Sequence, residues 1–305
     1  MGFSDGERAK RFIYVMYSSL ERSTQLRAGA SLALIRESES LKEAFAAKVS
    51  MVKKELSRIQ ETKTTTPKEA DYRLALAEYF EKGSDATIEK LQNFTKYVPR
   101  QSLTRFLSKY ELFKKVLNVQ GSIVECGVYL GGGLMTFAQL SAILEPVNHQ
   151  RRIIGFDTFT GFAAVSPQDK KSTSEHLKAG GLAADSYADL QRCAELYDQN
   201  RFLSHIPKVQ LVKGDLSKTA PQFLKDNPHT VVSLLYLDLD VYEPTKIALQ
   251  TFVPRMPKGS IIVFDELNAD TWPGETLAVL ETLGIKNLRI ERFPFDTYLS
   301  YAVLE

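Results

Sequence analysis

The pattern of apolar and polar residues changes near residue 120. Before that point, apolar residues recur at steps of three and four, as in the stripe from Leu41 to Ile59, and this spacing predicts helices between residues 5 and 118. After it, short apolar runs alternate with amphipathic segments, which predicts strands alternating with helices. The predicted strands are Ser122–Cys126, Arg152–Asp157, Val209–Lys213, Val231–Asp238, Ser260–Phe264, Leu288–Phe293 and Leu299–Leu304.

The end of the chain adds a distinctive feature to this sheet. The last two predicted strands are joined by Pro294–Thr297, which is too short for a parallel crossover, so we expect them to be antiparallel. We therefore predict an α/β fold with a Rossmann-like, seven-stranded sheet and a terminal antiparallel hairpin, as in class I methyltransferases. A dinucleotide-binding sheet normally lacks this hairpin.

The N-terminal third is predicted to form a helical region, residues 1–97, ahead of a methyltransferase-like domain, residues 98–305. Helices are expected over residues 68–81, 85–97 and 99–118, and Ser84 or Asp85 is the expected N-cap of the second. We expect the helical region to mediate self-association or to cover the acceptor site, so a homo-oligomer is predicted.

Composition narrows the function classes. The chain has 305 residues, 44% of them hydrophobic, which is typical of a globular protein. Its net charge of +2 gives no bulk attraction for nucleic acid or for a membrane surface. No segment approaches the roughly 20 apolar residues needed to span a bilayer. Two unclustered cysteines, Cys126 and Cys193, fit a reducing compartment, so a cytoplasmic location is expected.

Two predicted strands end on carboxylates. The fourth ends at Asp238, with Asp240 close behind, and the fifth is followed directly by Asp265 and Glu266. In a parallel sheet such strand ends meet at one edge, with neighbouring strands about 4.8 Å apart. Like charges gathered there repel one another unless a cation offsets them, and a divalent ion with oxygen ligands would do so. We predict a metal or substrate role for Asp238 and Asp265, while Asp240 either joins the site or caps the next helix.

A glycine-rich turn follows the first predicted strand. The segment Glu125–Gly133 leaves a strand and enters a helix, which is the context required for nucleotide binding. The helix start offers free N–H groups to an anion, and Glu125 suits a cationic group such as the amino group of S-adenosylmethionine. Because the pattern is not GxGxxG, it disfavours NAD.

Two further acids follow strands. Asp157 ends the second predicted strand, where a carboxylate accepts hydrogen bonds from ribose hydroxyls in enzymes that use either cofactor. Asp215 follows the third predicted strand, where either the adenine edge or an exposed turn residue is expected. Between them lies a long segment, residues 158–183, that is expected to be a loop or lid. It carries His176, for which a structural role is favoured over that of a catalytic base.

Four motifs, in this order, resemble one family. They are Ile123–Gly133, Gly155–Gly161, Leu237–Thr245 and Ile262–Glu266. Together they are similar to the macrocin O-methyltransferase (TylF/MycF-like) family, whose members methylate sugar hydroxyls of macrolides and related deoxysugars with S-adenosylmethionine and Mg²⁺. The resemblance covers roughly residues 95–305 and extends to nucleotide-deoxysugar 3-O-methyltransferases.

The resemblance implies roles for individual residues. Asp238, Asp265 and Glu266 would hold Mg²⁺, with Ca²⁺ or Mn²⁺ as alternatives, and Asp238 and Asp265 would be catalytic. The methyl donor would contact Glu125, Gly127, Tyr129, Asp157, Thr158, Asp215 and Asp238. The acceptor would be a small-molecule sugar. The chain departs from the family pattern at Glu266, where a second aspartate is usual, and at Thr160, where an acid is usual.

Two other interpretations are open at this point. An NAD-dependent oxidoreductase would share the sheet and Asp157. A non-catalytic assembly protein would use its N-terminal helices and keep the α/β domain as a scaffold. Cofactor binding separates these interpretations: S-adenosylmethionine with a metal, NAD, or neither.

Overall fold

The structure is a computed structural model that describes residues 65–305. Residues 65–305 form one compact unit, and this unit contains the whole sheet. The stripe from Leu41 to Ile59 and the other helices predicted before residue 60 lie outside the described residues. The predicted division at residue 97 stays a prediction.

Seven strands form one sheet in the order β3-β2-β1-β4-β5-β7-β6. Neighbours among β1 to β5 pair in parallel, whereas β7 is antiparallel to both β5 and β6. The strands are β1 (Ser122–Cys126), β2 (Ile153–Asp157), β3 (Val209–Lys213), β4 (Val232–Leu237), β5 (Ile261–Phe264), β6 (Ile290–Arg292) and β7 (Ser300–Val303). The predicted seven-stranded sheet and its terminal hairpin are confirmed.

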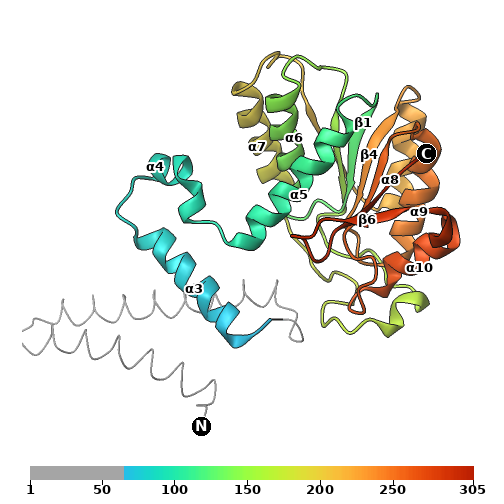
Figure 1. Ribbon diagram of the computed structural model, residues 1–305, viewed down its shortest axis with the longest axis horizontal. Helices are drawn as coiled ribbons and strands as arrows, with labels where there is room; N and C mark the ends of the chain where they lie inside the picture. The colour runs from blue at the N-terminus through green and yellow to red at the C-terminus, as the bar shows by residue number, and fades with distance from the viewer. Residues whose placement is uncertain (1–64) are drawn as a thin grey trace, which may run out of the picture. The chain divides into compact units, whose positions relative to one another are not determined.

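Helices cover both faces of the sheet (Figure 1). One face carries α5 (Arg100–Val116), α6 (Gly132–Leu144) and α7 (Tyr187–Gln199), and the other carries α8 (Leu216–Asp226), α9 (Tyr242–Phe252) and α10 (Pro273–Thr282). The shorter or N-terminal elements are α3 (Pro67–Lys82), α4 (Thr87–Gln92), η1 (Phe94–Lys96), η2 (Pro167–Lys171), η3 (Val253–Arg255) and η4 (Ile285–Asn287). Within residues 65–305, no helix combines the length and apolar composition needed to cross a membrane.

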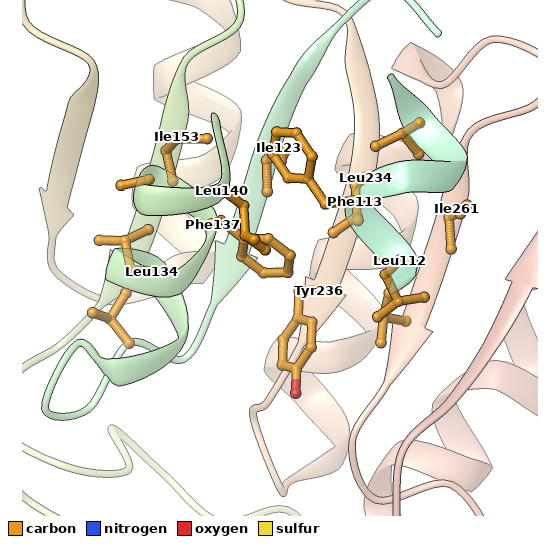
Figure 2. Packing of buried hydrophobic residues seen from close by; sticks show 14 of the residues in the cluster. Leu112, Phe113, Ile123, Leu134, Phe137, Leu140, Ile153, Leu234, Tyr236 and Ile261 are labelled. Atoms are coloured by element: carbon orange, nitrogen blue, oxygen red, sulfur yellow. The ribbon is translucent and has the colours of Figure 1, made fainter. Parts of the chain in front are cut away.

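Two apolar clusters fill the space between the sheet and its helices. Strand residues alternate between them, so Ile123 packs in the cluster beneath α5 and α6 while Val124 packs beneath α8 and α9. Figure 2 shows the first cluster, where Leu112 and Phe113 approach the sheet from α5. Tyr236 belongs to this cluster, with its hydroxyl pointing away from the apolar side chains (Figure 2). The buried face of β4 thus ends on a polar atom.

The predicted N-cap of the second helix is wrong. α4 begins after Ala86, whose N–H donates to the Glu89 side chain at 2.9 Å. The Asp85 carboxylate instead accepts hydrogen bonds from the Lys96 ammonium and the Tyr97 hydroxyl, each at 2.6 Å. These long-range partners outcompete the local cap, because two donors to one carboxylate outweigh a single backbone N–H.

Candidate active site

The ends of β4 and β5 bring three acids together. Leu237 lies opposite Phe264 in the register of the two strands, so the residues that follow them, Asp238 and Asp265, leave the sheet side by side. One oxygen each from Asp238, Asp265 and Glu266 lies within 4.8 Å of the others. Asp265 and Glu266 are buried, and Asp238 is half-buried. The convergence predicted from the two acidic strand ends is present in the geometry.

Burial makes two of these three acids hard to ionise. It raises the pKa of Asp238 to about 7, and the neighbouring Asp265 charge adds to the effect. Burial and the same Asp265 charge raise the pKa of Glu266 well above its usual range. At Asp265, burial also opposes ionisation, but the Arg105 guanidinium helps to outweigh it, and the pKa is lowered. Additional positive charge would therefore stabilise the ionised form of the cluster.

The donor set fits a hard divalent cation. All three side chains offer carboxylate oxygens, the ligands that Mg²⁺, Mn²⁺ and Ca²⁺ prefer. The Oε2 atom of Glu266 is buried with no hydrogen-bond partner, so one ligand atom is left for an ion.

Asp240 lies one residue before Val241, the N-cap residue of α9, and has a left-handed φ of 61°. It is thus not the N-cap residue of that helix.

Glu125 of β1 lies opposite Tyr236 of β4 in the strand register, and its carboxylate is buried beside the glycine-rich turn. A Cβ atom on Gly133 would lie 1.9 Å from Glu125 Oε1, so a glycine leaves room for this carboxylate. The Oε2 atom has no hydrogen-bond partner. Burial raises the pKa of Glu125 to about 8, against the opposing charge of Lys109. A cationic group, such as the ammonium of S-adenosylmethionine, would satisfy this carboxylate.

The Asp157 carboxylate holds the same turn in place. Its Oδ2 atom accepts hydrogen bonds from the N–H groups of Val128 and Tyr129 at 2.7 and 2.8 Å, and its Oδ1 atom accepts from the N–H of Phe159 at 2.6 Å. Tyr129 takes a left-handed φ of 52° within this turn. Asp157 therefore orders the backbone of the turn, and its predicted contact with a ribose stays a prediction.

Thr158 and Asp215 both have local partners. The Thr158 hydroxyl donates to the carbonyl oxygen of Gly161 at 2.6 Å. The Asp215 side chain caps α8 by accepting from the N–H of Ser217 at 3.0 Å. The roles predicted for both residues toward the methyl donor stay predictions.

Sequence reasoning missed the half-buried cation Arg105, the buried cation Lys109 and one buried acid around this edge. Arg105 and Lys109 lie one turn apart on α5: Arg105 donates to Asp265 Oδ2, and Lys109 donates to the Tyr236 hydroxyl at 3.0 Å. That hydroxyl donates in turn to Asp265 Oδ1 at 2.6 Å. Glu275 of α10 is fully buried and accepts from the N–H of Glu266 at 3.0 Å.

The spacing of residues along α5 and α10 could have indicated Arg105, Lys109 and Glu275. Arg105 and Lys109 precede Leu112, Phe113 and Val116 at steps of four and three, so they continue the buried stripe of α5. Glu275 likewise precedes Ala278 and Val279, which are buried on α10. A charged residue in register with a buried stripe indicates a buried polar partner.

The segment 158–183 is attached along the same edge. The Asp169 carboxylate accepts hydrogen bonds from the Tyr242 N–H at 2.9 Å and from the Ser166 hydroxyl at 2.6 Å. The Phe162 ring packs edge-on against Trp272, with ring centroids 5.7 Å apart. This segment is an anchored loop, and within it the Nε2 atom of His176 is buried without a hydrogen-bond partner.

Comparison with known proteins places the chain in a family. The macrocin-O-methyltransferase (TylF) family matches residues 56–282. The chain belongs to this family. The strand order, with antiparallel β7 next to β5, agrees with it and differs from the dinucleotide-binding order.

Two solved structures support the assignment to the family. A crystal structure of CalS11, a calicheamicin methyltransferase, is 35% identical, covers 80% of this chain and 96% of that chain, and superposes with a TM-score of 0.76. The apo structure of CalS11, named as a TDP-rhamnose 3'-O-methyltransferase, is 35% identical, covers 80% of this chain and 99% of that chain, and has a TM-score of 0.69. The O-methyltransferase NovP, at 22% identity over 66% of this chain and 80% of that chain, shares the fold with a TM-score of 0.54.

A curated relative from Streptomyces olivaceus is also similar. It is 8-demethyl-8-(2,3-dimethoxy-alpha-L-rhamnosyl)-tetracenomycin-C 4'-O-methyltransferase, 28% identical over 163 residues, or 50% of this chain. The chain spans about half of that relative's length, 55%.

Proposed function

We propose that the protein is an S-adenosylmethionine- and divalent-metal-dependent O-methyltransferase that acts on a hydroxyl of a deoxysugar. The main evidence is a group of three acids, Asp238, Asp265 and Glu266, that each offer one oxygen within 4.8 Å of the others. They share a sheet edge with Glu125, which has a buried oxygen without a hydrogen-bond partner. One cation would satisfy the acids and another would satisfy Glu125. Membership of the TylF family is consistent with this pair of ligands.

Residues around the glycine-rich turn are proposed to hold the methyl donor. Glu125 binds the ammonium, and the first N–H groups of α6, which begins at Gly132, face the donor's carboxylate. Asp157 accepts from one ribose hydroxyl with the lone pair left on Oδ1 by its three backbone donors, and Asp215 lies at the adenine edge. Gly127, Tyr129, Thr158 and Asp238 complete the proposed donor contacts.

The acids of β4 and β5 are proposed to position the acceptor. Asp238, Asp265 and Glu266 would hold a divalent cation, Mg²⁺ first and Mn²⁺ or Ca²⁺ as alternatives. When bound, such an ion supplies Lewis acidity that lowers the pKa of a substrate hydroxyl. Asp238 and Asp265 are the proposed catalytic residues, because they fix the acceptor oxygen relative to the donor.

The reaction balances as a direct displacement. The acceptor oxygen forms a bond to the donor's methyl carbon while the carbon–sulfur bond breaks and its electron pair stays on sulfur, which gives S-adenosylhomocysteine, and the hydroxyl proton is released to solvent. The residues of this edge contribute by orienting the two reactants in line and by excluding water.

The acceptor class is proposed from the relatives. CalS11 is named as a methyltransferase of TDP-rhamnose, and the curated relative is named for a rhamnosyl group on tetracenomycin C. Both acceptors are deoxysugars, one linked to a nucleotide and one to a natural product. We propose the same acceptor class for this chain.

Product analysis tests this function. The purified protein is incubated with S-adenosylmethionine, Mg²⁺ and TDP-rhamnose, and in parallel with a rhamnosylated natural product, and the sugar is analysed by mass spectrometry. We expect one added methyl group on one of the two acceptors, and its loss in Asp238→Asn. Methylation that persists unchanged in Asp238→Asn would refute the proposed role of this edge.

A further inference from the structure

Arg105 places a positive charge directly on the acidic cluster. Its guanidinium donates to Asp265 Oδ2, and the two side chains form an ion pair. The other oxygen of Asp265 accepts from the Tyr236 hydroxyl at 2.6 Å. Both oxygens of a proposed metal ligand are thus already bonded to donors of the protein itself, and one of these donors is a cation.

Arg105 is the strongest local source of positive charge for this cluster. Its guanidinium pairs directly with Asp265, whereas the Lys109 ammonium is linked to that carboxylate through the Tyr236 hydroxyl. A guanidinium stays charged under all working conditions. It therefore provides part of the positive charge that a metal ion would otherwise provide.

A second carboxylate lies within reach of the same guanidinium. The Nη1 atom of Arg105 is buried with no hydrogen-bond partner and lies 4.0 Å from Asp296 Oδ1. Asp296 is itself fixed: its Oδ2 atom accepts from the Ser108 hydroxyl at 2.7 Å, and its Oδ1 atom accepts from the N–H of Tyr298 at 3.2 Å. A small rotation would let Arg105 exchange a bond to Asp265 for one to Asp296.

We propose that Arg105 is the internal counter-cation of the metal-free site, which shifts from Asp265 toward Asp296 when a divalent cation binds and thereby sets the affinity for that cation. This inference rests on the metal site of the proposed function and adds a residue that competes with the metal. Arg105 is a positioning residue in this scheme, because it acts on the metal through Asp265.

Direct titration of Mg²⁺ tests the inference without any turnover. Isothermal calorimetry on the full chain gives the Mg²⁺ affinity. The fluorescence of Trp272, the chain's one tryptophan, gives an independent signal from the loop that carries Glu266 between β5 and α10. The variants are Arg105→Gln, which removes the charge, and Arg105→Lys, which keeps it. Lys114→Gln is the matched control, because it removes an exposed charge of α5 that pairs with Glu111 on the same helix.

We expect Arg105→Gln to bind Mg²⁺ about tenfold more tightly than the wild-type chain, since a repelling charge next to the ion is gone. Arg105→Lys and Lys114→Gln are expected to bind as the wild type does. Asp296→Asn should have the opposite effect and bind Mg²⁺ more weakly, because Arg105 loses its second carboxylate and stays on Asp265. If Arg105→Gln fails to fold, the Mg²⁺ affinity of Asp296→Asn serves as the test.

Unchanged or weaker Mg²⁺ binding in Arg105→Gln, or unchanged or tighter binding in Asp296→Asn, would overturn the counter-cation role. In either case the metal site of the proposed function would stand, because Mg²⁺ would still bind. If neither the wild type nor Arg105→Gln binds Mg²⁺, both the metal site and this inference are overturned.

Discussion

Glu125 carries a carboxylate into the interior beside β4, where one oxygen lacks a partner. Burial raises its pKa to about 8, so without a ligand it is mostly protonated at neutral pH. A raised folded-state pKa means that the folded chain binds a proton that the unfolded chain has lost. The stability of the unliganded protein is therefore expected to fall as the pH rises from about 4.5 toward about 8.

The same shift predicts how the donor's affinity depends on pH. A bound ammonium favours the ionised Glu125, so binding of S-adenosylhomocysteine should release a proton and strengthen as the pH rises toward about 8, by at most about tenfold per pH unit. Calorimetry in buffers of different ionisation enthalpy measures both effects. In Glu125→Gln, we expect S-adenosylhomocysteine to bind more weakly and its affinity to be independent of pH. A pH dependence equal to that of the wild type would show that Glu125 does not face the ammonium.

At the scale of single elements, the glycine-rich turn requires glycine at one position but not at another. Gly127 has a φ of +92°, and a Cβ atom there would lie 1.7 Å from the carbonyl oxygen of Asp238. Gly132, in the first turn of α6, would meet nothing within 4 Å. Two glycines of one motif therefore have different physical roles, although the sequence presents them alike.

Alanine substitutions separate these roles. Gly127→Ala is expected to lower the free energy of unfolding by about 3 kcal/mol, because it forces both a strained φ and a backbone clash. Gly132→Ala, the matched control, should change it by less than about 0.5 kcal/mol. Urea denaturation followed by circular dichroism measures both values. Equal stability of the two variants would contradict the conformation given for the turn.

One buried side chain, that of Asp169, joins the loop between β2 and α7 to two helices. α9 has no side-chain cap from its own N-cap residue, and Asp169 of η2 accepts from the Tyr242 N–H instead. Gly274 packs against the same carboxylate, since a Cβ atom there would lie 2.2 Å from Asp169 Oδ1. Asp169 thus joins the loop to both α9 and α10.

Loss of this anchor should loosen the loop. We expect Asp169→Ala to lower the free energy of unfolding by about 1–2 kcal/mol and to speed tryptic cleavage after the exposed residues Lys170 and Lys171. Asp215→Ala removes a local helix cap of similar strength, about 1 kcal/mol, and is the control. If cleavage of the two variants proceeds at the same rate, Asp169 is not the anchor.

At the scale of the whole molecule, the apolar patterns predicted the sheet well. Strands such as β1 and β4 are short, buried runs with clear ends, since β1 lies between Gly121 and Gly127 and β4 stops at Asp238, so their pattern depends little on the rest of the chain. The meeting of Asp238 and Asp265 followed from one rule, that parallel strands present their carboxyl ends at one edge.

The partners of these acids could not be predicted in the same way. Arg105 and Asp265 are 160 residues apart in the sequence, and only the packing of α5 against the sheet brings them together. Asp169 and Tyr242 likewise meet through an irregular loop that has no periodic pattern. Sequence periodicity identifies which residues face inward, whereas tertiary packing determines which of them meet.

Some whole-chain properties stay predictions. These are the homo-oligomer, the cytoplasmic location, and the absence of nucleic-acid and membrane partners. Membership of the TylF family favours the methyltransferase over the NAD-dependent oxidoreductase and the assembly protein.

Metal add-back during methyl transfer tests the central claim most directly. The chain is treated with EDTA, returned to buffer with S-adenosylmethionine and a deoxysugar acceptor, and assayed for S-adenosylhomocysteine before and after Mg²⁺ is added. We predict little turnover without Mg²⁺ in either the wild type or Glu266→Gln, recovery with Mg²⁺ in the wild type, and at least about a hundredfold lower turnover in Glu266→Gln than in the wild type when Mg²⁺ is present. Full turnover in EDTA, equal in the wild type and in Glu266→Gln, would contradict a metal-dependent site at this edge.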